Sequence, residues 1–248
     1  MRNLTEISRF EPVLFLLYDP PERKKYSIEA LKCSKFSPRI LVGGSDRITP
    51  QNTAIMIKTL RKYTNSPIYE FPGHHKKICG EADGIFTPCV VNSEYLKYFS
   101  DLQADAEPML RRIYGNKVEW VCYLIQGGKV ARAAKAKRLT KEQIIRRFDY
   151  WTKMGNFDWY YLEAGSGEEM LPLDLILECN RICQERHKKF IYGGGIRTFK
   201  QAQPLYKNKI NIVIGNALFD PEGVLEVKKI QKHLYTARKM PAWTFILK

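Results

Sequence analysis

Short apolar segments recur along the chain, and longer segments with a helical spacing of apolar residues separate them. The apolar segments lie at residues 13–19, 39–45, 67–73, 84–91, 120–128, 158–165, 190–195 and 210–216. Helical spacing is found at residues 50–63, 94–114 with an interruption near Pro108, 140–154, 173–187, 199–206 and 221–235. Several apolar segments are continuous runs, as expected of strands buried on both faces of a parallel sheet. The pattern therefore predicts alternating β-strands and α-helices.

Eight such units predict a single (β/α)8 TIM barrel over residues 1–248, with a C-terminal tail at 236–248. An open doubly wound sheet is the alternative, but no GxGxxG follows the first strand and no switch point is evident. The third connection, HHKKICGEAD at 74–83, is too short and too polar for a crossover helix. We therefore expect an incomplete third crossover and an opening along that flank of the barrel.

Composition narrows the class of protein. Hydrophobic residues make up 44% of the chain and charged residues 27%, and no apolar stretch reaches the roughly 20 residues that span a bilayer. The first residues show no signal-peptide cleavage pattern, so we expect a cytoplasmic protein. The six cysteines have no CxxC spacing, and we expect reduced thiols and no zinc site.

The net charge of +15 favours anionic partners, which include phosphorylated substrates, membrane surfaces and nucleic acid. Many of the basic residues lie between Arg111 and Lys153. No RNA- or DNA-binding motif accompanies them, so we expect no nucleic-acid partner.

Glycine-rich sequences follow the last three predicted strands. AGSG at 164–167 follows the sixth strand, GGG at 193–195 the seventh and GN at 215–216 the eighth. In TIM barrels the last two of these loops commonly bind phosphate through exposed backbone N–H groups. The sixth loop adds further bare backbone and a serine hydroxyl. Together the three loops predict one phosphate site.

Asp19 and Ser45 end the first and second strands on the same face of the predicted barrel. Magnesium takes one or two protein oxygens and completes its octahedron with water and substrate phosphate. We therefore predict that Asp19 and Ser45 bind Mg²⁺ beside a second phosphate group, which a diphosphate would supply.

Tyr161 and Glu163 alternate with Leu162 and so share one face of the sixth strand. A carboxylate in the barrel mouth is costly unless it hydrogen-bonds a substrate hydroxyl, in which case it can act as a general base. His74 and His75 are the alternative bases, although their polar loop predicts that they are exposed.

Six motifs in order connect these features: LYDP (17–20), VGGS (42–45), EFPG (70–73), YLEAGSG (161–167), GGGIR (193–197) and IGN (214–216). Together they resemble the geranylgeranylglyceryl phosphate synthases and their heptaprenylglyceryl phosphate relatives. YLEAGSG with GGGIR is the specific signal. The resemblance implies a TIM barrel that transfers a polyprenyl group, with Mg²⁺, from its diphosphate to the 3-hydroxyl of sn-glycerol 1-phosphate, forming an ether lipid.

The resemblance also implies roles for single residues. Asp19 and Ser45 would hold Mg²⁺, and Glu163 with Tyr161 would act on the attacking hydroxyl. With Gly193 added from the loop pattern, the acceptor site would comprise Tyr161, Leu162, Glu163, Ala164, Gly165, Ser166, Gly167, Gly193, Gly194, Gly195, Gly215 and Asn216.

The chain departs from that family at three places. After AGSG it continues Glu168-Glu169-Met170, where small residues are usual. Its first-strand motif continues Asp-Pro-Pro-Glu-Arg at 19–23 where Asp-Pro-Asp-Lys is usual, and its fifth loop, GGKVARAAKAKR, is more basic. An extra cation near the acceptor suits an acceptor with an added carboxylate. A similar enzyme of moenomycin-type phosphoglycolipid biosynthesis prenylates 3-phosphoglycerate, so that acceptor is the alternative, with Lys129 or Arg132 beside it.

Two other classes stay open. An isomerase or aldolase on the same barrel would share the glycine loops but would need neither Asp19 with Ser45 nor an apolar channel. A non-catalytic membrane- or nucleic-acid-binding module would not depend on Glu163. The basic, aromatic tail either packs against the barrel or a partner subunit of a homodimer, or anchors the protein at a membrane surface.

Overall fold

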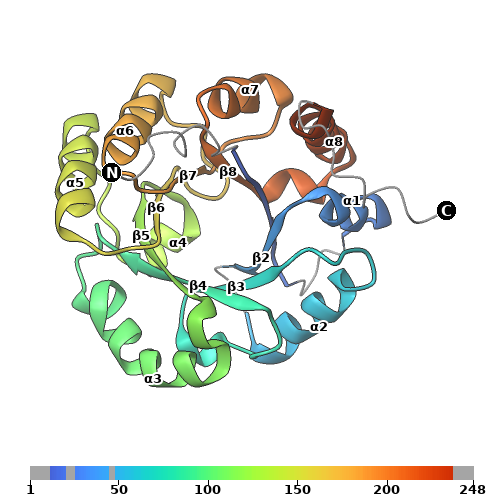
Figure 1. Cartoon of the computed structure of the whole chain (residues 1–248), viewed down its shortest axis with the longest axis horizontal. Helices are drawn as coiled ribbons and strands as arrows, with labels where there is room; N and C mark the ends of the chain where they lie inside the picture. Colours follow the sequence, from blue (N-terminus) through green and yellow to red (C-terminus); the bar gives the residue numbers. More distant parts are fainter. Residues whose placement is uncertain (1–11, 21–25, 45–47, 237–248) are drawn as a thin grey trace, which may run out of the picture.

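The computed structural model describes residues 12–20, 26–44 and 48–236, and it shows a barrel of eight parallel strands inside a ring of helices (Figure 1). The strands are β1 (Leu14–Tyr18), β2 (Arg39–Gly44), β3 (Ile68–Pro72), β4 (Gly84–Val90), β5 (Val118–Ile125), β6 (Trp159–Glu163), β7 (Phe190–Gly193) and β8 (Asn211–Ile214). Each pairs with its neighbours in chain order, and Val213 of β8 lies opposite Phe15 of β1 to close the barrel. The TIM-barrel prediction is confirmed.

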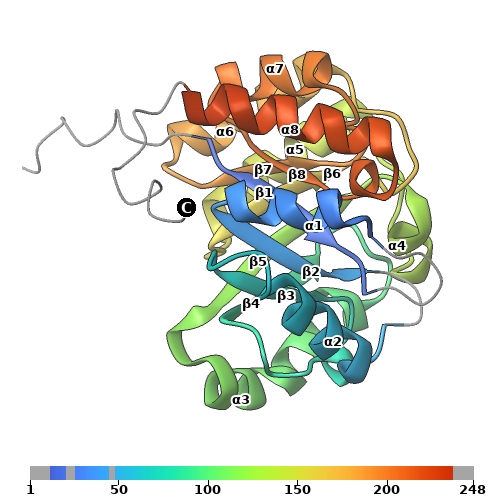
Figure 2. The ribbon, with the colours of Figure 1, turned by 90° about the vertical axis from the view of Figure 1, so that its right-hand side faces the viewer.

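Seven helices form the described part of the ring: α1 (Ile28–Cys33), α2 (Pro50–Leu60), α3 (Leu102–Tyr114), α5 (Lys141–Met154), α6 (Leu173–Glu185), α7 (Phe199–Lys207) and α8 (Pro221–Thr236). The shorter α4 (Gly128–Ala133) lies at the end of the barrel where the strands terminate (Figure 2). Single turns complete the fold: η2 (Ser34–Phe36), η3 (His75–Lys77), the π-helical η4 (Lys97–Asp101), η5 (Gly115–Lys117) and η6 (Asn216–Phe219). No helix in these ranges is long and apolar enough to cross a bilayer.

The helix starts follow from the sequence. Thr49, Thr140 and Thr198 each form a capping box at the start of α2, α5 and α7. The interruption predicted near Pro108 is wrong, because α3 is continuous through it. Pro108 and Ala104, whose carbonyl loses its N–H donor, both lie on the exposed side, so solvent can replace the missing bond.

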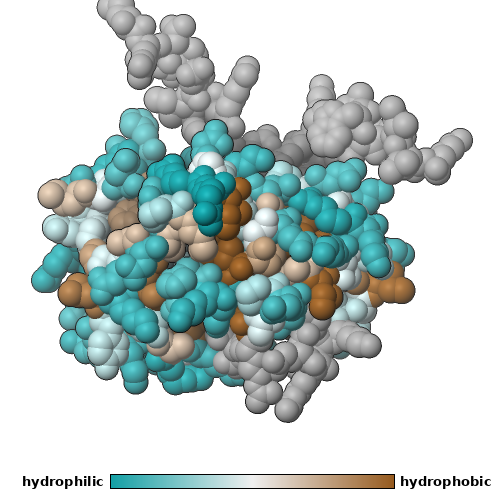
Figure 3. Space-filling model, turned by 90° about the horizontal axis from the view of Figure 1, so that it is seen from below, coloured by the Kyte–Doolittle hydropathy of each residue, from teal (hydrophilic) through white to brown (hydrophobic). Residues whose placement is uncertain are grey.

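The incomplete third crossover is confirmed. Between β3 and β4 the chain forms only the single turn η3. Seen from the side on which α2 and α3 lie, apolar residues reach the surface in a band between hydrophilic ones (Figure 3). The barrel flank is therefore open to a ligand where a helix would otherwise cover it.

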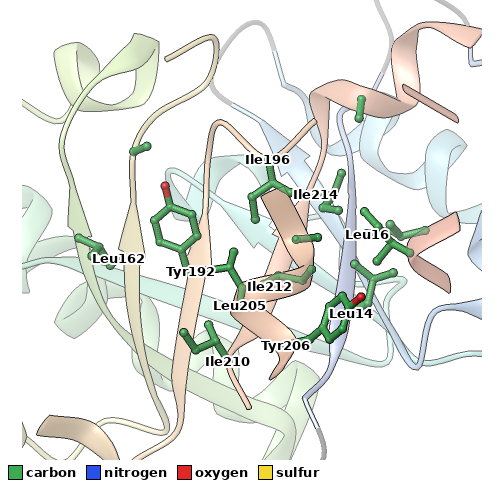
Figure 4. Packing of buried hydrophobic residues seen from close by; sticks show 14 of the residues in the cluster. Leu14, Leu16, Leu162, Tyr192, Ile196, Leu205, Tyr206, Ile210, Ile212 and Ile214 are labelled. Atoms are coloured by element: carbon green, nitrogen blue, oxygen red, sulfur yellow. The ribbon is translucent and has the colours of Figure 1, made fainter. Parts of the chain in front are cut away.

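Alternation along the strands separates two cores. Phe15, Phe86 and Trp159 fill the inside of the barrel. Tyr192 and other outward-facing residues pack against α7, as Figure 4 shows for the strands β6, β7, β8 and β1. Burial of each large apolar side chain contributes about 2 kcal/mol, so the two cores hold the strand ends rigidly in place.

Two predicted features lie outside the described residues, namely Ser45 and residues 237–248 of the tail. The six cysteines are all described and are free thiols, as predicted.

Candidate active site

A cavity of about 420 Å³ runs from the mouth of the barrel to the open flank. Residues that follow β1, β6, β7 and β8 line it at the mouth, and residues of the β3–β4 connection, β4 and α3 line it along the flank. Because the lining is continuous, two ligands can meet in this space, one at each end.

Three loops bring bare backbone together at the mouth. Those of their residues that line the cavity are Gly165, Ser166, Gly167, Gly194, Gly195, Gly215 and Asn216. Asn216 Nδ2 donates to Ser166 Oγ at 3.1 Å and so joins the sixth and eighth loops. Within the described ranges the amide N–H groups of Ser166, Gly194 and Gly195 have no protein acceptor. A concave set of such donors is suited to phosphate.

Gly194 and Gly195 tolerate no side chain. Their φ angles are 82° and 74°, a region that L-residues rarely adopt. A Cβ on Gly194 would lie 2.7 Å from Gly165 N, and one on Gly195 would lie 2.2 Å from Met170 N. The close packing of the sixth and seventh loops therefore requires glycine at both positions.

Arg197 is a site residue that was not predicted. It lines the cavity beside these loops, and its exposed guanidinium has no ion-pair partner in the part of the chain that the structure describes. An unpaired guanidinium can bind phosphate oxygens in a bidentate manner. Its signal in the sequence is the arginine that ends GGGIR.

Glu163 ends β6 with its carboxylate in the mouth. Tyr161 Oη donates a hydrogen bond to Glu163 Oε2. Burial raises the pKa of Glu163 to about 7, against the hydrogen bonds from Tyr161 and Gly165, and the charge of Asp19 adds to the increase. Burial also keeps the pKa of Tyr161 well above its usual range, so that its hydroxyl stays a donor. A carboxylate with this pKa suits proton transfer at neutral pH.

The absence of a side chain at Gly193 leaves room for Tyr161 and Glu163. A Cβ there would lie 2.3 Å from Tyr161 Oη and 2.8 Å from Glu163 Oε2. Gly193, Leu162 and Ala164 were predicted to bind substrate, but none of them lines the cavity. Leu162 packs in the core between barrel and helices, and the Ala164 N–H donates to the Gly193 carbonyl. These three residues therefore position the residues that line the cavity and do not line it themselves.

Asp19 lines the same mouth, where its Oδ1 would lie 2.9 Å from a Cβ on Gly44. Gly44 directly precedes Ser45, so the first and second strand ends come together as predicted. The described residues hold no cluster of three or more His, Cys, Asp or Glu side chains for a metal ion. A lone carboxylate beside a phosphate site nevertheless fits Mg²⁺, which takes most of its remaining oxygens from phosphate and water.

The flank part of the cavity is a largely apolar channel. Its apolar lining includes Ile78, Ile85, Leu102, Ala106 and Leu110, and Thr87 and Gln103 add polar atoms. At the junction with the mouth, the rings of Phe71, Tyr123 and Tyr161 pack at centroid distances of 5.0 to 6.1 Å. The sequence predicted an opening here, but not which residues line it.

The expectation that His74 and His75 are exposed is wrong. Both are half-buried in the channel wall, with ring centroids 4.3 Å apart. Burial lowers the pKa of His74, and the nearby charges of His75 and three lysines lower it further. They lie there because the short connection folds back over the flank.

Glu70 closes the flank where the crossover helix is missing. Its side chain is only 1% exposed and faces away from the barrel interior. Its carboxylate accepts hydrogen bonds from Cys79 N at 3.0 Å, Gly80 N at 2.9 Å and Tyr114 Oη. These bonds satisfy the buried charge and tie β3, the β3–β4 connection and the end of α3 together.

The two cations that were predicted to bind an acceptor carboxylate lie outside the cavity. Lys129 and Arg132 are exposed on α4, and neither lines the cavity.

Comparison with known proteins agrees with this geometry. Residues 5–234 match the sequence profile of the PcrB family. A geranylgeranylglyceryl phosphate synthase of Zunongwangia profunda is 29% identical over 217 residues, which cover 84% of this chain and 91% of the relative. A heptaprenylglyceryl phosphate synthase of Bacillus mycoides is 27% identical over 225 residues, which cover 87% and 93%. The resemblance found in the motifs is confirmed.

A solved structure is similar over nearly the whole chain. It is the (S)-3-O-geranylgeranylglyceryl phosphate synthase of Thermoplasma acidophilum in complex with its substrate sn-glycerol-1-phosphate. It shares 25% identity and a TM-score of 0.77, and the alignment covers 93% of this chain and 96% of that one.

Proposed function

Because this chain belongs to the PcrB family, we propose that it is a prenyltransferase that joins a polyprenyl group to a three-carbon phosphate through an ether bond. The observation that carries the proposal is the single cavity that combines a backbone phosphate site, a carboxylate with a pKa of about 7 and an apolar channel. A phosphate-sugar isomerase or aldolase would use the first two features but not the third.

In this reaction the acceptor phosphate lies on the amides of Gly194, Gly195 and Ser166, with Arg197 beside it. Its attacking hydroxyl, the 3-hydroxyl of sn-glycerol 1-phosphate, lies at Glu163, which orients it and accepts its proton as the oxygen attacks C1 of the prenyl group. The new C–O bond forms while the C1–O bond to the diphosphate breaks, and the diphosphate leaves with that electron pair. Tyr161 holds the Glu163 carboxylate in the orientation that this transfer requires.

The allylic carbon becomes positive as the diphosphate departs. Phe71, Tyr123 and Tyr161 lie where the mouth meets the channel, and the faces of their rings favour positive charge. The apolar channel removes water, which would otherwise compete with the acceptor for this carbon.

Mg²⁺, held by Asp19 with Ser45, would supply charge neutralisation for the departing diphosphate. Asp19 itself is held by its backbone N–H, which donates to Tyr26 Oη at 2.8 Å. That contact orients the carboxylate toward the cavity that it lines.

For the acceptor, we infer sn-glycerol 1-phosphate, the substrate bound in the similar Thermoplasma acidophilum enzyme. The alternative acceptor, 3-phosphoglycerate, was inferred from cations of the fifth loop that would bind its carboxylate. Lys129 and Arg132 of that loop do not line the cavity, so this argument no longer holds. Competition between equal concentrations of the two acceptors decides between them, and preferential prenylation of 3-phosphoglycerate would reverse the assignment.

The activity is tested with purified full-length protein, Mg²⁺, geranylgeranyl diphosphate and sn-glycerol 1-phosphate. We expect mass spectrometry to detect a prenyl glycerol phosphate ether and a matching amount of diphosphate. Gly194→Ala should abolish the product, since its Cβ would displace the phosphate loops. Gly115→Ala, which does not line the cavity and whose Cβ meets no atom within 4 Å, should retain it. Absence of an ether with every prenyl donor tried would reject the proposal.

A further inference from the structure

A second, open groove is lined by residues of the β5–α5 connection, which includes α4, and of the segments after β4 and β6. Figure 2 shows α4 at the end of the barrel where the strands terminate, which is the end of the cavity mouth. Arg132, Lys135 and Arg138 line it, together with Glu94, Gln126 and Glu168. The backbones of Gly165 and Gly127 meet between the groove and the phosphate loops, since a Cβ on Gly165 would lie 2.4 Å from Gly127. The groove therefore adjoins the acceptor site and shares the Glu168 side chain with it, whereas Arg132, Lys135 and Arg138 line the groove alone.

Gln126 presents an unused donor in this groove. Its side chain is 6% exposed, and its Oε1 accepts a hydrogen bond from Leu139 N at 2.9 Å. Its Nε2 is buried without an acceptor among the described residues. A buried amide left unpaired costs about 1–3 kcal/mol, and an anion in the groove would remove this cost.

The charge of the groove is also unbalanced. The side chains of Arg132, Lys135 and Arg138 form no ion pair within the described ranges. The two carboxylates are already engaged, because Glu94 pairs with Lys137 at 3.2 Å and Glu168 accepts from Gly128 N at 3.1 Å. The surplus positive charge complements an anion.

The frame of the groove is rigid. Asn92 Nδ2 donates to the carbonyl of Lys137 at 2.7 Å, and Glu94 N donates to the carbonyl of Lys135 at 3.0 Å. Lys135 has a φ of 51°, a left-handed conformation that a lysine adopts only when its surroundings impose it. The cations are therefore presented on a fixed loop.

Directly beside Glu94, Tyr95 is 54% exposed and Leu96 is 70% exposed. Apolar side chains next to a cationic groove are the combination found in proteins that bind at the membrane interface. A soluble phosphate would use the cations and Gln126 but would leave Tyr95 and Leu96 without a role.

We propose that this groove binds the phosphate of an anionic lipid head group, with Tyr95 and Leu96 entering the acyl region. Gln126, Arg132 and Arg138 bind the phosphate oxygens, and the cavity mouth at the same end of the barrel then lies close to the bilayer. Lipid binding itself follows from the groove alone. Its use, to receive prenyl donor and release lipid product at the membrane, rests on the proposed function.

The test is sedimentation of the full-length protein with phosphatidylcholine vesicles, with and without phosphatidylglycerol. We expect binding only to the anionic vesicles, and a loss of about 30-fold in affinity for the double variant Arg132→Gln/Arg138→Gln, since each cation near the surface contributes about a fivefold factor. Arg112→Gln/Arg146→Gln removes the same charge from exposed positions on α3 and α5 and should bind like wild type.

Two further variants distinguish vesicle binding by the groove from attraction by the overall positive charge of the protein. Gln126→Met keeps the volume but removes the unpaired donor, together with the acceptor of Leu139 N. Tyr95→Ser/Leu96→Ser removes the apolar contact, and both variants should weaken vesicle binding. An equal loss in both arginine double variants would overturn the proposal. The proposal would also be overturned if the protein bound neither kind of vesicle but bound inorganic phosphate, with an affinity that depends on Gln126 and Arg132.

Transfer from a short, soluble prenyl diphosphate serves as the independent readout. It should be unchanged in Arg132→Gln/Arg138→Gln, because these residues do not line the catalytic cavity. If the protein shows no transfer at all, the proposed function fails while the vesicle measurement still tests the groove.

Discussion

A general base works best when its pKa lies close to the pH at which the enzyme operates. Burial brings the pKa of Glu163 to about 7, and Tyr161 fixes the direction of its carboxylate. Gly193 leaves room for both groups, because any side chain there would collide with them. At the scale of single residues, the chemistry therefore depends on one carboxyl group and on the absence of a Cβ beside it.

Glu163→Gln should lower kcat by about 100- to 10,000-fold, because glutamine keeps the shape but cannot accept the proton. The KM for the acceptor should change little. In wild type, kcat should rise with pH through about 7 as Glu163 loses its proton. Steady-state kinetics across pH check both points, with the exposed Glu169→Gln as the control. A wild-type kcat in Glu163→Gln would contradict the assignment of the base.

The same pKa makes a prediction about stability. Glu163 has a pKa of about 7 in the folded state and 4.5 as its ordinary value, so the folded protein binds more protons between these two values. The free energy of unfolding should therefore fall by about 3 kcal/mol as pH rises from 4.5 to 7. Glu163→Gln should lose this decrease and exceed wild type in stability above pH 7. Denaturant unfolding at several pH values measures it, and an identical pH dependence in both proteins would refute it.

Among the elements, the β3–β4 connection and α3 determine what the barrel can hold. The missing crossover helix leaves a channel, and the side of α3 that carries Leu102, Ala106 and Leu110 forms its outer wall. The hydrogen bond from Tyr114 to Glu70 joins the end of α3 to β3 beside this channel. The length of the bound prenyl chain should therefore respond to changes on this side of α3.

Ala106→Phe should shift the enzyme toward shorter prenyl diphosphates, because the new ring occupies the channel at a buried position. Ala104→Phe lies on the exposed side of the same helix and serves as the matched control. Product lengths from a mixture of donors, read by mass spectrometry, provide the comparison. An unchanged distribution in a stably folded Ala106→Phe protein would place the chain elsewhere.

Tyr114→Phe should lower the free energy of unfolding by about 1–3 kcal/mol, since the buried carboxylate of Glu70 loses one of its donors. Tyr150→Phe, at an exposed position on α5, should be neutral. Denaturant titration of both variants measures the difference. Equal stability of the two would show that Glu70 does not depend on this hydrogen bond.

The strands and the open flank were predictable because they leave clear patterns. Continuous apolar runs mark the buried strands, and the ten residues at 74–83, most of them polar, are too few for a crossover helix. The helices α1 and α4 were not predicted, since six residues are too few to establish a period. The channel wall was also missed, because only tertiary packing brings His74 and Ala106 to one cavity.

At the level of the whole molecule, the barrel places its reactive parts and its charge at one end. Asp19 after β1 and the loops after β6, β7 and β8 line the mouth, and the cationic groove of the β5–α5 connection lies at the same end. The net charge of +15 attracts anionic substrates and surfaces. Donor, acceptor and membrane can thus reach the protein from one side.

The most direct test is a crystal structure of the full-length protein with Mg²⁺, sn-glycerol 1-phosphate and a geranylgeranyl thiodiphosphate that reacts slowly. We expect the acceptor phosphate on the amides of Gly194, Gly195 and Ser166, its 3-hydroxyl at Glu163, and the prenyl chain between β4 and α3. A prenyl chain outside this channel, or an acceptor hydroxyl away from Glu163, would contradict it.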